Sequence, residues 1–217
     1  KPFNITSDPN FLFLSRVHKE AFSHLLYGIN QRKGFLEITG EVGAGKTTLC
    51  RALLSQLDRK TKTAFIFNST LPELQLIQAI LEDYGIIVTG RSKVSMLRQL
   101  NNFLIEELAR GNNVVLIIDE AQNLKPSILE EIRMLNNLET DKEKLFQIIL
   151  VGQPELRNKL SSPDLKQLRQ RISVRFHITP LENDEIEKYI NHRLAVAGST
   201  GQIMFSPDAI ECIYGFS

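Results

Sequence analysis

Residues 40–47 follow the pattern G-x-x-x-x-G-K-[ST], and this octapeptide limits the possible folds of the chain more than any other feature. A β-prone run at residues 35–39 leads into it, and a helical stretch at 48–57 follows it. Glycines allow a loop to wrap closely around phosphate groups, with its backbone N–H groups pointing inward at a helix N-terminus. A glycine-rich turn with an incidental lysine is the alternative, but the flanking strand and helix favour a phosphate-binding loop.

The residue types in this loop suit a nucleoside triphosphate with Mg²⁺. We expect Lys46 to neutralise the β- and γ-phosphates, and therefore to be catalytic as well as nucleotide-binding. We expect Thr47 to ligate Mg²⁺ through its hydroxyl group. The nucleotide-binding residues predicted from the motif are Gly40, Glu41, Val42, Gly43, Ala44, Gly45, Lys46, Thr47 and Thr48.

Polar side chains follow two apolar runs, at the positions where a parallel sheet places its ligands. Asp119 and Glu120 end the most apolar run of the chain. Asp119 is expected to hold Mg²⁺, and Glu120 to orient and deprotonate the attacking water; two solvated acids in a turn are the alternative. Gln153 follows a later run, where it could touch the γ-phosphate or the water. An ordinary loop residue ahead of Pro154 is an equally good interpretation of Gln153.

The order of these features favours ATP over GTP. A further β-prone run at residues 63–67 lies between the loop strand and the strand that ends in Asp119. This intervening strand, and a catalytic acid directly after the magnesium acid, belong to the ATPase branch of P-loop proteins. The guanine-reading motif N-K-x-D is also missing, because the only Asn-Lys pair continues as Leu160-Ser161. The sequence therefore predicts an ATP hydrolase.

Five β-prone runs alternate with helical stretches, and the pattern becomes purely helical after Pro180. Alternation of this kind implies right-handed crossovers and a parallel sheet. We expect an α/β P-loop domain with a five-stranded parallel sheet over residues 1–180, followed by the start of an incomplete α-helical lid over 181–217. The five runs lie at residues 35–39, 63–67, 114–118, 146–151 and 174–178.

Charge is balanced overall but uneven along the chain. The 26 basic and 25 acidic residues leave a net charge of +1, which argues against nucleic acid as the main partner. Residues 157–175 are strongly basic, whereas residues 119–143 are mainly acidic. Oppositely charged faces suit head-to-tail contact between copies, which closes into a ring or continues as a filament. Solvated charged helices explain the same pattern, and both interpretations stay open.

The two cysteines and the lengths of the apolar runs bear on the cellular compartment of the protein. Cys50 and Cys212 are too few and too far apart for a disulfide framework, and we expect both to be small buried apolar residues. This cysteine usage indicates a reducing compartment, the cytoplasm. No apolar run approaches the roughly 20 residues of a membrane helix. The chain has no starting methionine and stops abruptly, so we expect it to be part of a longer protein.

Together, these motifs resemble those of AAA+ ATPases. The opening segment at residues 2–15, the continuation Asp119-Glu120-Ala121-Gln122-Asn123-Leu124 and the stretch at 151–156 narrow the resemblance to the ExeA/GspA family. Members of that family are ATPases of the type II secretion machinery, with close cousins in mannose-sensitive pilus biogenesis. The resemblance covers nearly the whole chain.

This resemblance implies several further properties. It implies that Arg171 stabilises the transition state on a neighbouring subunit, that Arg169 contributes beside it, and that Phe13 and Leu14 flank the adenine. It also implies a membrane-spanning helix and a peptidoglycan-binding part outside residues 1–217, and an inner-membrane secretion partner. The chain would then be the cytoplasmic domain of an inner-membrane protein, and the lid arginine of the family would lie beyond Ser217.

Two other classes of protein compete with this interpretation. A DNA-binding AAA+ ATPase of the transposition or replication-initiation type shares the pattern at residues 119–122, and salt-dependent DNA binding would favour it. A nucleotide-gated scaffold that does not hydrolyse ATP is disfavoured, because Glu120 is present.

Overall fold

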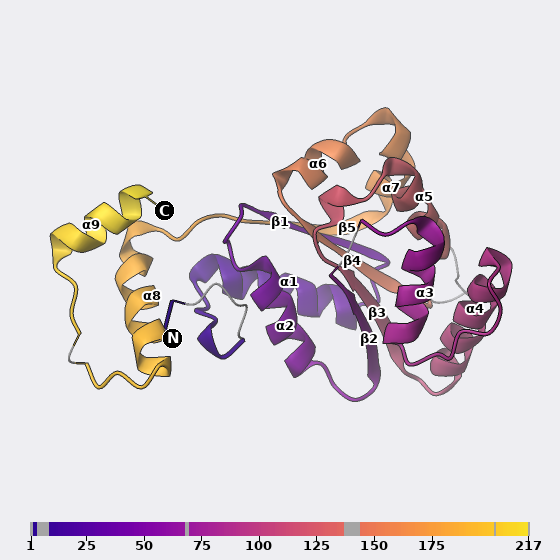
Figure 1. The fold of residues 1–217 in the computed structure, drawn as a ribbon, viewed down its shortest axis with the longest axis horizontal. Helices are drawn as coiled ribbons and strands as arrows, with labels where there is room; N and C mark the ends of the chain where they lie inside the picture. The colour runs from indigo at the N-terminus through magenta and orange to yellow at the C-terminus, as the bar shows by residue number, and fades with distance from the viewer. Residues whose placement is uncertain (1, 4–8, 68–69, 137–143, 202, 217) are drawn as a thin grey trace.

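The structure is a computed structural model that describes residues 2–3, 9–67, 70–136, 144–201 and 203–216. A five-stranded sheet in the order β2-β3-β4-β1-β5 forms its centre, and every neighbouring pair of strands is parallel (Figure 1). This sheet confirms the predicted fold class. The strands are β1 (Phe35–Gly40), β2 (Thr61–Ile66), β3 (Asn113–Ile118), β4 (Gln147–Gly152) and β5 (Ile172–Ile178).

Helices cover both faces of the sheet, which explains why its central strands are continuously apolar. The helices of this part are α1 (Arg16–Asn30), α2 (Lys46–Gln56), α3 (Glu73–Asp83), α4 (Lys93–Ala109), α5 (Pro126–Leu135), α6 (Pro154–Leu160) and α7 (Lys166–Arg171). On β3, Val115 and Ile117 belong to a core shared with α1 and α2, whereas Leu116 and Ile118 belong to a core shared with α3, α4 and α5. The described residues also form 3-10 turns at η1 (Pro9–Phe11), η2 (Ala121–Asn123) and η3 (Pro163–Leu165).

Two helices follow the sheet and lie to one side of it, α8 (Asn183–Val196) and α9 (Pro207–Phe216) (Figure 1). Ile186, Ile190 and Leu194 form a small cluster of their own on α8. The purely helical pattern predicted after Pro180 is therefore observed, while the domain boundary at residue 180 stays a prediction. Among the residues described, no helix is both long and apolar enough to cross a membrane.

The two cysteines differ in environment. Cys50 is fully buried in the core on the α1 and α2 side, as expected. The expectation of a buried Cys212 was wrong, because this residue is exposed on α9. Ile210 and Ile213 pack against the α8 cluster, and helical spacing turns Cys212 away from it.

Candidate nucleotide-binding and hydrolysis site

The phosphate loop joins the end of β1 to the start of α2, and the geometry of the loop explains why several of its positions are glycine. Gly43 and Gly45 have φ values of 81° and 77°, a region that favours glycine. A Cβ atom on Gly40 would lie 2.7 Å from the carbonyl oxygen of Ile178 on the adjacent strand β5. Gly45 is the N-cap residue of α2 and has no side chain to bond the first N–H groups of this helix, so these groups can bind an anion. The other predicted loop residues are at the exposed tip (Glu41, Val42) and in the first turn of α2 (Thr48).

Lys46 is buried at the base of this loop. Its Nζ donates hydrogen bonds to the carbonyl oxygens of Gly40 and Glu41, at 2.8 Å each. Burial lowers the pKa of Lys46, whereas the nearby charges of Glu120 and Asp119 raise it. A desolvated ammonium group gains from an anion placed beside it. The loop therefore fits the phosphates of a nucleotide.

Thr47 and Asp119 come from two different elements and meet directly. The Thr47 hydroxyl donates a 2.5 Å hydrogen bond to Oδ2 of Asp119. Burial raises the pKa of the Asp119 carboxyl group, and the hydrogen bond from Thr47 lowers it. Oxygen ligands of this kind, one carboxylate and one hydroxyl, are what Mg²⁺ accepts in phosphate sites, where water and phosphate complete its shell. These two residues therefore fit the predicted metal.

Glu120 occupies a backbone conformation that is rare for a residue with a side chain. Its φ and ψ are 52° and 36°, in the left-handed region, and its N–H donates to Oδ1 of Asp119 at 2.9 Å. Such a conformation costs of order 1–3 kcal/mol and persists only where surrounding contacts impose it. Strain of this kind is concentrated at functional sites, which agrees with the predicted role of Glu120 as general base.

Gln153 contacts the predicted base directly. Its Nε2 lies 3.3 Å from Oε2 of Glu120, so the contact joins the residues that follow the neighbouring strands β3 and β4. The same Oε2 accepts a hydrogen bond from Nε2 of Gln122. Of the two interpretations that the sequence left open, this contact favours Gln153 as part of the site. The sequence reasoning missed Gln122 as a site residue, although its position two residues after Glu120 was a signal.

Comparison with known proteins identifies the family. Residues 29–160 match the AAA domain family. The chain belongs to the AAA family. Over all 217 residues it is 42% identical to the General secretion pathway protein A of Aeromonas hydrophila, and it spans 40% of the length of that relative. The resemblance to ExeA/GspA-type ATPases is thereby confirmed, and a nucleotide-binding ATP hydrolase is what the AAA domain supports.

Solved structures share this AAA fold at low identity. The ORC2 protein of Aeropyrum pernix, in ADPNP and ADP complexes, has a TM-score of 0.70 at 18% identity, over 90% of this chain and 55% of that chain. CDC6P of Pyrobaculum aerophilum has a TM-score of 0.68 at 20% identity, over 96% and 58%. Domain III of the Thermotoga maritima replication initiation protein DnaA has a TM-score of 0.59 at 18% identity, over 98% and 82%. At these identities the likeness shows the fold alone.

The two arginines expected to be catalytic lie far from the phosphate loop of their own AAA domain. Arg169 and Arg171 end α7, directly before β5. In the register of the sheet, Ile172 pairs with Phe35 and Ile178 pairs with Gly40. The arginines are therefore at the opposite end of β1 from the loop, roughly 20 Å away at the usual rise per strand residue. The structure does not bring them together with Lys46, Asp119 and Glu120 in one chain.

His18 is a second residue that sequence reasoning missed. It lies on α1, and its Nε2 is 2.9 Å from the carbonyl oxygen of Ala44 in the phosphate loop. Its Nδ1 is 2.7 Å from Oγ of Ser15, the residue that caps α1. Burial lowers the pKa of His18. Nothing in the sequence places α1 against the loop, so no sequence signal marked this contact.

The segment expected to flank the adenine packs against α8. The Phe13 ring lies 6.1 Å from that of Tyr189 and 5.8 Å from that of His192, between ring centroids. Leu14 is 38% exposed. The segment therefore joins the sheet-containing part to α8, and its role beside adenine stays a prediction.

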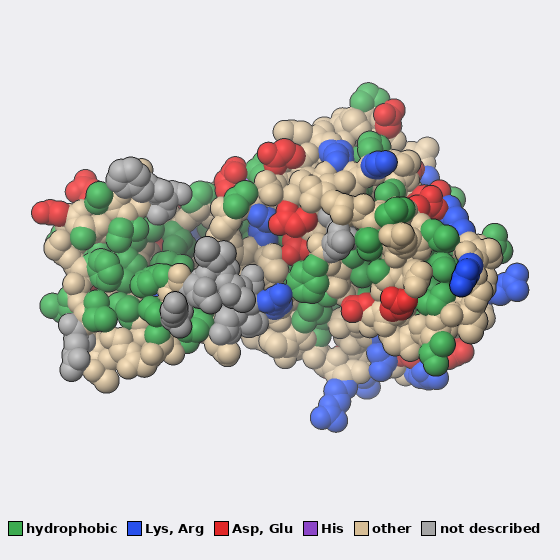
Figure 2. All heavy atoms as spheres, viewed as in Figure 1, with side chains coloured by type: hydrophobic (Ala, Val, Ile, Leu, Met, Phe, Trp, Pro, Cys, Tyr) green, Lys and Arg blue, Asp and Glu red, His purple; other side chains and the backbone are tan. Residues whose placement is uncertain are grey.

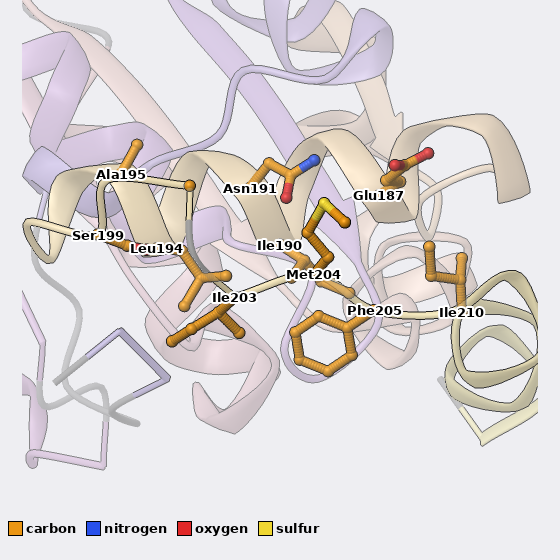
Figure 3. A pocket seen from close by; sticks show the side chains of 11 residues that line it. Glu187, Ile190, Asn191, Leu194, Ala195, Ser199, Ile203, Met204, Phe205 and Ile210 are labelled. Atoms are coloured by element: carbon orange, nitrogen blue, oxygen red, sulfur yellow. The ribbon is translucent and has the colours of Figure 1, made fainter.

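A cavity of about 490 Å³ lies in the α8–α9 region and has a different character from the nucleotide site. Figure 3 shows side chains of α8 and of the segment before α9 around it, including Leu194, Ile203, Met204 and Phe205. Figure 2 shows hydrophobic side chains gathered over this end of the molecule, where Met204 is 87% exposed. Its lining residues include none from the phosphate loop, so it is no part of the nucleotide site.

Proposed function

We propose that this AAA domain binds ATP with Mg²⁺ and hydrolyses it to serve a bacterial secretion or pilus machine of the cell envelope. The observation that carries the chemistry is the meeting of Thr47 with Asp119, beside a buried Lys46 and a strained Glu120. These are the groups that a P-loop ATPase needs on its phosphates, on its metal and on the attacking water.

Each side chain has a separate task in this proposal. Lys46 leaves its carbonyl partners to neutralise the β- and γ-phosphates, and Thr47 and Asp119 hold Mg²⁺. A metal ion held by these two residues would offset the charge that develops on the phosphate oxygens. Glu120 takes the proton of the attacking water, and Gln153 orients that water or the γ-phosphate.

Hydrolysis in this proposal requires a second copy of the chain. Arg171, with Arg169 beside it, lies at the end of the sheet opposite its own phosphate loop, so it can act only on a neighbour's ATP. An arginine supplied in trans stabilises the charge of the transition state. The homo-oligomer is then a ring or a filament built by heterologous contacts.

The envelope role rests on the secretion relative. That protein is named for a general secretion pathway, and all 217 residues of the chain match it, over 40% of the length of that relative. On this basis we propose a cytoplasmic domain of an inner-membrane protein, with an inner-membrane partner and with peptidoglycan bound by regions outside this chain. The replication-initiation alternative is supported by the likeness of fold and by the pattern at residues 119–122, but the net charge of +1 gives it no support.

The test is a comparison of nucleotide binding and ATP hydrolysis in substituted proteins. Glu120→Gln should bind ATP like the parent but hydrolyse it about 10²–10⁴-fold more slowly, because an amide cannot accept the proton of the water. Lys46→Ala should lose ATP binding, measured by calorimetry, because the phosphates lose the only cation of the loop motif. The exposed Glu211→Gln on α9 is the matched control and should change neither quantity. Unaltered turnover in Glu120→Gln would remove Glu120 from the mechanism.

A further inference from the structure

Gln122 connects the proposed general base to the end of the neighbouring strand. Its Oε1 accepts a 3.1 Å hydrogen bond from the backbone N–H of Gln153, directly after β4. A backbone N–H can only donate, so Oε1 must face Gln153, and Nε2 then faces the carboxylate of Glu120. Nε2 donates to Oε2 of Glu120. One amide group therefore joins Glu120, after β3, to the backbone after β4.

The surroundings are shaped to admit this amide. A Cβ atom on Gly152 would lie 2.6 Å from Oε1 of Gln122 and 3.0 Å from Cδ2 of Leu156. Any side chain at position 152 would therefore collide with the bridge from Gln122. The absence of a side chain at the end of β4 leaves room for the Gln122 amide.

The backbone of Gln122 is held as well as its side chain. Lys159, which reaches over from α6, donates hydrogen bonds to the carbonyl oxygens of Gln122 and Leu124. The second of these is 2.7 Å long. Gln122 thus lies in a turn that is tied to α6, so its amide approaches Glu120 from a fixed direction.

Glu120 needs such external contacts. Its left-handed backbone is unfavourable for a residue with a side chain and requires neighbours that maintain it. A general base also has to lie within hydrogen-bond reach of the water that it deprotonates. Amides from Gln122 and Gln153 both donate to Oε2 of this carboxylate. Its orientation is therefore coupled to the end of β4.

We propose that Gln122 is a positioning residue that orients the carboxylate of Glu120 for proton abstraction and couples that orientation to Gln153. The inference rests on the proposed ATPase function, because it acts through Glu120. Gln122 itself makes no contact with the phosphates in this role. Its loss should therefore affect the chemical step and leave nucleotide binding unchanged.

The first variants test the hydrogen bonds of the Gln122 amide separately from the volume of its side chain. Gln122→Leu removes both hydrogen bonds at similar volume, and should lower kcat about 10–100-fold with the ATP affinity unchanged within about twofold. Gln122→Glu keeps the shape but places an acceptor where Nε2 donated, so its kcat should fall at least as far. The exposed Gln75→Leu on α3 is the matched control and should keep the parent kcat. Turnover is measured at protein concentrations that allow assembly.

A double-mutant cycle then distinguishes positioning from a general structural effect. If Gln122 acts through Glu120, adding Gln122→Leu to Glu120→Gln should cause no further loss of turnover. Further loss by the same factor as in the parent, or parent-level kcat in Gln122→Leu, would overturn the inference. Gln122→Asn keeps the amide but is one methylene too short for both contacts, and it replaces Gln122→Leu in the cycle if thermal melting shows that Gln122→Leu is unfolded.

The same variants distinguish a failure of the proposed ATPase function from a failure of the proposed role of Gln122. A parent protein without turnover, or a Glu120→Gln variant with full turnover, would overturn the proposed function and the role of Gln122 with it. A slow Glu120→Gln variant beside an unaffected Gln122→Leu variant would overturn the role of Gln122 alone.

Discussion

His18 shows at the scale of one residue how a contact outside the motif bears on the phosphate loop. Its Nε2 meets the carbonyl oxygen of Ala44, and a Cβ atom on Gly45 would lie 3.0 Å from the same nitrogen. With Nε2 protonated and donating to Ala44, Nδ1 accepts from the Ser15 hydroxyl, so the neutral ring satisfies both contacts. The buried environment favours this neutral form and lowers the pKa of His18.

This lowered pKa predicts a loss of stability in acid. As pH falls below the unfolded value of 6.5, the unfolded chain binds a proton before the folded chain does, so the free energy of unfolding decreases until pH reaches the lowered pKa. The decrease is at most about 1.4 kcal/mol per pH unit, for one proton. The hydrogen bond to the Ala44 carbonyl oxygen opposes the lowering of the His18 pKa, and the negative charge of Glu185 opposes it to a smaller extent.

The measurement is urea unfolding at pH 7.5 and 5.5. His18→Gln keeps an amide donor for Ala44 but does not titrate, so it should lose less stability than the parent over this interval. The exposed His24→Gln is the control and should behave like the parent. An equal pH dependence in all three proteins would contradict a neutral buried His18.

At the scale of elements, the start of α8 is tied to the start of α1 through one carboxylate. Glu185 accepts a 2.9 Å hydrogen bond from the N–H of Arg16 and also closes the capping box of α8 with Glu182. The Arg16 guanidinium adds an ion pair to Glu182 at 2.6 Å, although both side chains are largely exposed. Exposed pairs of this kind stabilise little, so the buried Glu185 dominates the junction.

Glu185→Ala should therefore destabilise the protein by about 1–2 kcal/mol, because two backbone N–H groups lose their acceptor. Glu185→Gln keeps an acceptor oxygen and should cost less. The measurement is denaturant unfolding followed by circular dichroism. Glu187→Ala, at an exposed position of the same helix, controls for the loss of one carboxylate; a loss as large as that of Glu185→Ala would contradict the proposed junction.

At the scale of the whole molecule, the sheet order separates the arginines from the loop. Because β5 runs parallel to β1 at the edge of the sheet, the residues before β5 and the residues after β1 are at opposite ends. A single copy of the chain thus presents a phosphate loop at one end and Arg171 at the other. Head-to-tail assembly is the arrangement that brings the two together.

Arg171→Ala should bind ATP normally but hydrolyse it poorly at concentrations that allow assembly, by about 10³-fold if it acts as an arginine finger. Arg169→Ala should have a milder effect. Mixing Arg171→Ala with Glu120→Gln should restore part of the turnover, because an interface between the two variants combines an intact Glu120 with an intact Arg171. Parent-level hydrolysis by Arg171→Ala, or no gain on mixing, would show that Arg171 is not a finger.

Sequence patterns alone were enough to predict the fold class, the family and the residues that form the phosphate loop and the acid pair. These features are local: the glycine pattern at 40–47 and the acids after the apolar run at 114–118 depend only on chain neighbours and on the alternation of a strand. The strand bounds shifted by a few residues, as for β5, which begins at Ile172 and not at Val174. Such shifts arise because pairing with a neighbouring strand, and not apolar character, defines where a strand starts.

The contacts between groups far apart in the sequence became visible only in the folded chain. The contact of Gln122 with the end of β4, that of His18 with the loop, and the separation of Arg171 from it all depend on strand order and helix placement. The exposure of Cys212 depends on which face of α9 meets α8. Such contacts join residues far apart in the chain, and sequence patterns, which are local, do not show how strands and helices pack to bring these residues together.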